Sequence, residues 1–172
     1  MTITDDIAQV VRDTKGMLCT LEPMADLWTP TVHVVTDHGR HVAMVLAPEC
    51  VHHQTETAEA VRAEVAPELV GTVAVVVETL IRLGDDAEVI PDSLHGEYEA
   101  NPGSLTQPAV LILSATVHGT RSVRILPYRW DDDGAPAWGA HIDCPAGPVG
   151  MGVGAMLLEL ADRLSWHERF LH

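Results

Sequence analysis

Residues 71–81 read GTVAVVVETLI, and this run decides the fold class of the chain. It holds four valines and two threonines, whose branched side chains favour the extended backbone of a β-strand over the continuation of a helix. Apolar residues occupy both sets of alternating positions, so both faces of such a strand would be buried. The run therefore predicts a central strand of a β-sheet.

The segments on either side of this run predict its neighbours in the sheet. TVHVVTDHGRHVAMVL, at residues 31–46, alternates in polarity around a His-Gly pair, which is typical of a β-hairpin. After the Val-rich strand, turn-forming residues separate three further apolar runs at 109–118, 121–130 and 137–142. These runs predict a three-strand antiparallel meander.

Three segments have helical patterns, at 4–15, 55–65 and 150–165. The segment 84–108 is rich in acids, prolines and glycines, and we expect it to form a long acidic loop. The whole chain, 1–172, is thus expected to be one α+β domain. In that domain a single, mostly antiparallel sheet would carry helices packed on it.

The order of the predicted elements can be compared with that of known proteins. A hairpin, a helix, a Val-rich strand that ends near Glu78 and a meander containing LPYRWDDDGAPAWG (126–139) follow one another in the sequence. Over residues 30–140 this organisation is similar to that of small uncharacterised α+β proteins of phage and actinobacterial type. The resemblance implies a fold organisation and no activity.

Composition narrows the classes of partner. The chain has 172 residues and a formal net charge of −15, which repels phosphate backbones and anionic membrane surfaces. The N-terminal residues lack the basic and apolar regions of a secretory signal, and no apolar run approaches the roughly 18 residues of a membrane span. Three widely spaced cysteines fit reduced thiols. We therefore expect a cytoplasmic protein that binds neither nucleic acid nor membranes.

The register of the first hairpin decides whether two of its histidines meet. A two-residue turn would place His33 and His41 on opposite faces, because side chains alternate along each strand. A three-residue turn at 37–39, with Gly39 in the left-handed conformation, would pair Val35 with His41 and bring both histidines to one face. We prefer the three-residue turn because it gathers the hairpin's other apolar side chains on the opposite face. The two histidines would then lie on the solvent side.

These histidines are the candidates for a metal site. Zinc sites use three or four imidazole, thiolate or carboxylate ligands in near-tetrahedral geometry. His33 and His41, joined by His52 or Cys50, have the right donor chemistry, but their spacing matches no zinc signature. We expect surface imidazoles rather than a bound ion, and we predict no cofactor. The alternative is a metal-dependent hydrolase that uses the three histidines, with Glu78, an acid within an apolar run, as its catalytic base.

No other motif indicates an enzyme, and the sequence favours a non-enzymatic binding or assembly protein that acts through protein contacts and self-association. The expected interface group is aromatic, since tryptophans are common interface anchors: Trp130, Trp138 and Trp166. A further alternative is an inhibitor whose acidic segment at 84–104 imitates a nucleic acid and occupies a basic protein.

Overall fold

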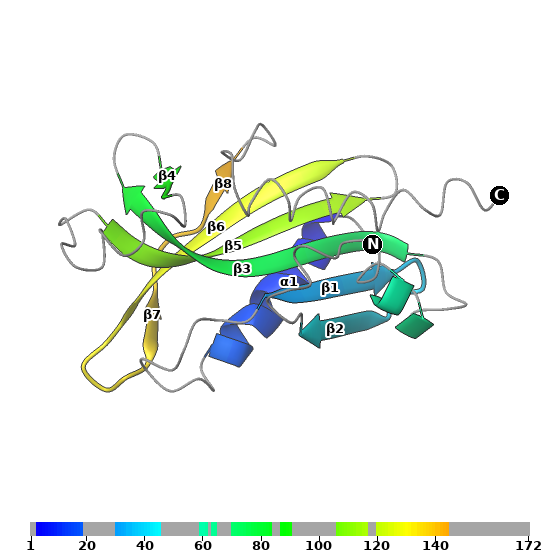
Figure 1. Ribbon diagram of the computed structural model, residues 1–172, viewed down its shortest axis with the longest axis horizontal. Coiled ribbons are helices and arrows are strands. Elements are labelled where there is room, and N and C mark those ends of the chain that lie inside the picture. The colour runs from blue at the N-terminus through cyan, green and yellow to red at the C-terminus, as the bar shows by residue number, and fades with distance from the viewer. Residues whose placement is uncertain are drawn as a thin grey trace.

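The computed structural model describes residues 3–18, 30–45, 59–61, 63–64, 70–83, 87–90, 106–116 and 120–144. Within these ranges one N-terminal helix, α1 (Ile3–Leu18), lies against a single curled sheet of antiparallel strands (Figure 1). The architecture is largely β with a little α, which confirms the predicted antiparallel sheet. No helix in the described ranges is long and apolar enough to cross a membrane.

Eight strands make up the sheet in the part of the chain that the structure describes. In chain order they are β1 (Thr31–Thr36), β2 (His41–Val45), β3 (Val70–Leu83), β4 (Ala87–Val89), β5 (Thr106–Thr116), β6 (Arg121–Trp130), β7 (Pro136–Trp138) and β8 (Ile142–Cys144). Their order across the sheet is β2-β1-β3-β5-β6-β7, with β4 beside β3 and β8 beside β6. The predicted hairpin, central strand and meander are all present.

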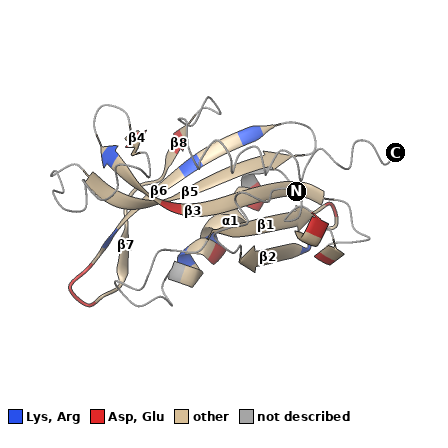
Figure 2. Ribbon diagram, in the orientation of Figure 1, with Lys and Arg blue, Asp and Glu red and all other residues tan. Residues whose placement is uncertain are grey.

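Strand β3 is central, as its composition predicts. It pairs with β1 on one side and with β5 on the other. Four consecutive residues on it, 73–76, are at most 1% exposed, so both faces of the strand are covered. Strand β5 carries no charged residue, and β3 carries only Glu78 and Arg82 (Figure 2). Charged residues are absent from β5 because both faces of this strand are removed from water.

The two faces of the sheet carry two separate cores. One face packs against α1, and we call its apolar residues the α1-side core: Val10, Ala74, Val76, Val110, Ile112, Leu126 and Tyr128. The other face holds a larger cluster, the opposite core, which includes Val75, Leu111 and Leu113 together with Val61 from the helical residues 59–61. Adjacent residues on one strand therefore enter different cores.

Helix α1 begins and ends with charges that suit its dipole. Asp5 and Asp6 lie in its first turn and Lys15 lies in its last. The side that faces the sheet buries Ile7 and Val10 at helical spacing. The buried residues of α1 thus recur at helical spacing. They define the side of the helix that faces the sheet, and other side chains on that side also meet the strands.

The hairpin has the predicted three-residue turn. Val35 pairs with His41, and Gly39 has a φ of 80°, in the left-handed region. The Thr36 N–H donates to the Arg40 carbonyl at 2.9 Å and so closes the turn around residues 37–39. The register prediction is confirmed, and His33 and His41 lie on one face of the hairpin.

Replacing Gly39 by alanine is expected to lower the free energy of unfolding by about 1 kcal/mol, because an L side chain is strained at positive φ. Gly16 provides a matched control. It lies inside α1 with nothing within 4 Å of an added Cβ, so alanine there is expected to raise stability by about 0.5–1 kcal/mol. Urea unfolding of both variants measures the difference. Equal effects at the two sites would contradict the strained conformation of Gly39.

Several segments differ from the sequence expectation. The segment 84–108, expected as one loop, contains β4 and the first residues of β5, because Val89 pairs with Ile81 and Thr106 pairs with Arg82. The third meander strand is divided into β7 and β8, which pair with different parts of β6. In the predicted helix at 55–65 the described residues are helical, and the one expected at 150–165 lies outside the described ranges.

Candidate metal centre

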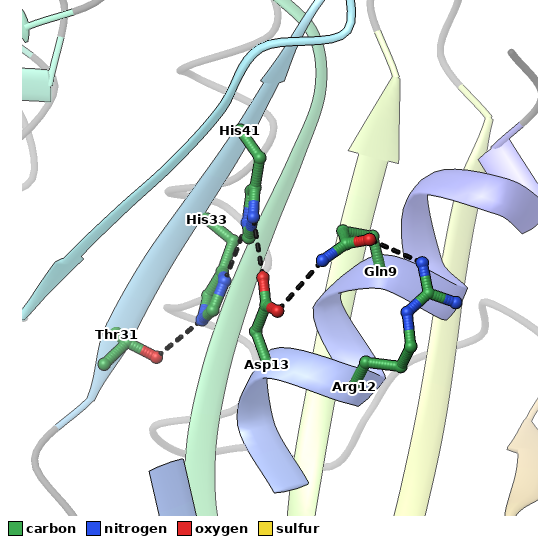
Figure 3. A network of polar contacts seen from close by, with 6 residues as sticks. All are labelled: Gln9, Arg12, Asp13, Thr31, His33 and His41. Carbon is green, nitrogen blue, oxygen red and sulfur yellow. Dashed lines mark hydrogen bonds and ion pairs between the residues drawn. The ribbon is translucent and has the colours of Figure 1, made fainter. Parts of the chain in front are cut away.

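His33 is the buried member of the histidine pair. Its side chain projects from β1 toward α1 and is 0% exposed. The prediction that His33 and His41 lie on the solvent side is therefore wrong for His33, whereas the His41 side chain is partly exposed. The hairpin register was correct, but α1 covers the face that the register assigned to the two histidines (Figure 3).

The two histidines belong to a continuous line of polar contacts (Figure 3). Thr31 Oγ1 lies 3.0 Å from His33 Nε2, and His33 Nδ1 lies 3.1 Å from His41 Nε2. The other nitrogen of His41, Nδ1, lies 2.7 Å from Asp13 Oδ2 on α1. The two imidazole rings are stacked, with centroids 5.2 Å apart and planes inclined by 19°. The line joins the buried start of β1 to the helix surface.

The chemistry of these groups fixes the direction of the hydrogen bonds when both imidazoles are neutral. The Asp13 carboxylate only accepts, so His41 Nδ1 carries the proton and donates to it. His41 Nε2 then accepts from His33 Nδ1–H, and His33 Nε2 accepts from the Thr31 hydroxyl. Every donor in the line points toward the carboxylate.

Burial keeps the His33 imidazole neutral. Desolvation, reinforced by the neighbouring His41 and partly opposed by Asp13, lowers the pKa of His33 to about 4. A neutral imidazole has a free lone pair on one nitrogen, which is the form that binds metal ions. The Thr31 hydroxyl both donates and accepts, so either tautomer of His33 is satisfied at Nε2. With Nε2 protonated, Nδ1 would present its lone pair toward that of His41 Nε2, an arrangement that requires a cation between the two nitrogens.

Neighbours on α1 hold the carboxylate in place. The Gln9 amide donates to Asp13 Oδ1 at 2.9 Å, and Arg12 donates in turn to Gln9. The side chains of His41 and Asp13 are 18% and 34% exposed. The cluster is thus closed at Thr31 and His33 and reaches solvent at its His41 and Asp13 end.

Three of these residues bring together donor atoms of the kinds that bind metal ions. One ligand atom from each of Asp13, His33 and His41 lies within 4.8 Å of the others. The facing nitrogens of the histidines are 3.1 Å apart, close to the roughly 3.3 Å that separates two ligands of a tetrahedral zinc ion. Asp13 contacts Nδ1 of His41, the ring nitrogen that does not face His33. This carboxylate–histidine contact is the usual support of a ligating imidazole, and it raises the basicity of the ligand.

The sequence found two of these three residues. His33 and His41 were candidates and the structure brings them together, whereas His52 and Cys50 lie outside the described residues. Asp13 is not among the candidates that the sequence predicts. Its signal is its position on α1, three residues after the buried Val10, which puts an acid on the sheet-facing side of the helix.

Glu78, the expected catalytic base, lies elsewhere on the sheet. It is four residues along β3 from Ala74, the residue paired with His33, a distance of about 13 Å at the usual strand rise. The Tyr128 hydroxyl donates to Glu78 Oε1, and burial together with this carboxylate raises the pKa of Tyr128. Glu78 therefore belongs to a separate contact with the α1-side core.

The described tryptophans of the expected interface group lie beside the same core. Trp130 and Trp138 flank Tyr128 with ring centroids 5.6 and 5.5 Å from it, and the Lys15 ammonium lies 5.1 Å from the Trp138 ring. Both tryptophans are half-buried. Trp166 lies outside the described residues, and an interface role for this group stays a prediction.

Comparison with protein-family models, with curated proteins and with solved structures finds no match to this chain. The chemistry of the site therefore has to be inferred from its own donor set. Two imidazole nitrogens and one carboxylate suit zinc and its neighbours among the transition metals. Calcium and magnesium prefer oxygen ligands alone, and the two histidines disfavour them.

Proposed function

We propose that this protein is a non-enzymatic binding protein whose ligand is a divalent transition-metal ion of the zinc class. The observation that carries the proposal is the convergence of Asp13, His33 and His41, from a helix and a hairpin, with donor atoms within 4.8 Å of one another. The neutral state of His33 supports it, because a protonated imidazole cannot ligate. The net charge of −15 supports it too, since it attracts cations.

Burial favours binding over catalysis. Thr31, which has the only hydroxyl in the network of Figure 3, is 1% exposed, and His33 beside it is 0% exposed. Neither side chain is able to meet a substrate. The base expected for a hydrolase, Glu78, is about 13 Å along the sheet from this cluster. A metal ion held here would therefore be bound without taking part in a catalysed reaction.

The proposal predicts one ion per chain. Protein stripped with a chelator and titrated with Zn²⁺ in a calorimeter is expected to bind with a stoichiometry of about one. Replacing His41 by alanine removes a ligand at a partly exposed position and is expected to weaken binding by more than about 100-fold. Replacing Asp13 by asparagine keeps the side chain's shape but removes its charge, and it is expected to weaken binding by about 10- to 100-fold.

His38 is the matched control. It lies in the turn of the same hairpin, its side chain is 78% exposed, and it contacts Asp37 rather than the cluster. His38→Ala is expected to bind Zn²⁺ as the parent protein does. Absence of binding by the parent protein would overturn the proposal, as would equal losses in His38→Ala and His41→Ala. Co²⁺ gives an independent readout, because its visible absorption reports nitrogen ligation in the parent and its loss in His41→Ala.

A further inference from the structure

We propose that ion binding at this site fastens helix α1 to the hairpin, so that the metal controls how firmly the helix covers the sheet. This inference concerns the regulation of the same site and rests on the proposed function. The residues of the site come from two separate elements: Asp13 lies on α1, whereas His33 and His41 lie on β1 and β2. The complete site exists only while the helix is docked.

The docking of α1 includes polar groups that are incompletely paired. Asp6 is 6% exposed, and its Oδ2 accepts from the Thr72 hydroxyl at 2.7 Å. Its other oxygen, Oδ1, finds no hydrogen-bond partner among the described residues, and neither does the hydroxyl of Thr14, which is 0% exposed. Buried polar atoms without partners favour the open state, in which water satisfies them.

The site itself supplies a polar contact between α1 and the hairpin. Asp13 reaches across to His41 at 2.7 Å, and the pair is partly open to solvent. A single hydrogen bond that is partly open to solvent contributes only about 1 kcal/mol to stability, so without metal this contact holds the helix weakly. An ion held by the two histidines strengthens this contact, because the Asp13 carboxylate then supports a ligating imidazole.

Linkage gives the size of the effect. A ligand shifts an opening equilibrium only by the ratio of its affinities for the two states. Undocking α1 removes the carboxylate but leaves the two imidazoles on the hairpin. Loss of a carboxylate that supports a ligating histidine weakens metal affinity by about 10- to 100-fold. At saturating ion the opening constant of α1 is therefore expected to fall by about the same factor.

Amide hydrogen exchange measures this opening constant. With saturating Zn²⁺, the amides of residues 10–17 of the intact chain are expected to exchange about 10- to 100-fold more slowly than in chelator. Amides of β8 (Ile142–Cys144), which pairs with β6 away from the hairpin, serve as the internal reference and are expected to change little. Calorimetry on the same samples establishes whether the ion is bound.

Asp13→Asn separates the inference from the proposed function. At Zn²⁺ concentrations that saturate the variant, the histidine pair still holds the ion, but α1 is expected to gain no protection. Asp132→Asn, an exposed acid in the β6–β7 turn, is the matched control and should keep the full gain. Calorimetric binding with unchanged α1 exchange in the parent would overturn the inference and leave the proposed function standing. So would an equal gain in Asp13→Asn. Absence of binding would overturn both.

Discussion

Replacing Leu111 or Ile112 by alanine is expected to lower the free energy of unfolding by about 3 kcal/mol in each case. The two residues are neighbours on β5, and each is 1% exposed. Leu111 packs in the opposite core and Ile112 in the α1-side core. Each truncation leaves a cavity in a different layer, because neither face of β5 has room to collapse around it. Urea unfolding followed by circular dichroism measures both losses.

Val45 offers the control for this pair. It lies on β2 and is 65% exposed, so truncation to alanine is expected to change stability by less than about 0.5 kcal/mol. A small loss at Ile112 beside a large loss at Leu111 would show that α1 does not pack on its face of the sheet. Such a result would also remove the structural basis of the candidate metal centre.

The stability of the metal-free protein is expected to fall by about 3 kcal/mol between pH 7 and pH 4 through His33 alone. The folded pKa of His33, about 4, is below the ordinary histidine value of about 6.5, so the unfolded chain binds more protons between these pH values. The contribution of a neutral buried histidine is fully present above about pH 6.5. It is lost as the pH falls toward 4.

The measurement is urea unfolding in chelator at pH 7, 5.5 and 4, on the parent and on His33→Asn. The variant is expected to lose less stability across this range, because it has no imidazole at that position to protonate. An NMR titration of the His33 ring in the parent gives a second readout that does not depend on the variant folding. A titration midpoint near 6.5, or the same pH dependence in both proteins, would contradict the buried neutral state.

The sequence by itself determined the centre of the sheet and its first hairpin. Strand β3 was predicted as central because valines at both alternating sets of positions leave no solvent-facing side. The hairpin register followed from one glycine and from the separation of apolar and polar faces, and Gly39 has the expected positive φ. These features depend on neighbours along the chain or on adjacent strands, so a local pattern of side chains is sufficient to specify them.

Only the tertiary structure decided what covers the polar face of the hairpin. The sequence predicts a helix at 4–15 but not where it docks, because an amphipathic helix satisfies any apolar surface of suitable shape. Once α1 packs on Val76 and Ile112, Asp13 meets His41, and His33 passes from an expected surface position to complete burial. The donor set joins residues of a helix and a hairpin that no sequence spacing relates. It exists because a core of apolar side chains places α1 over the two histidines.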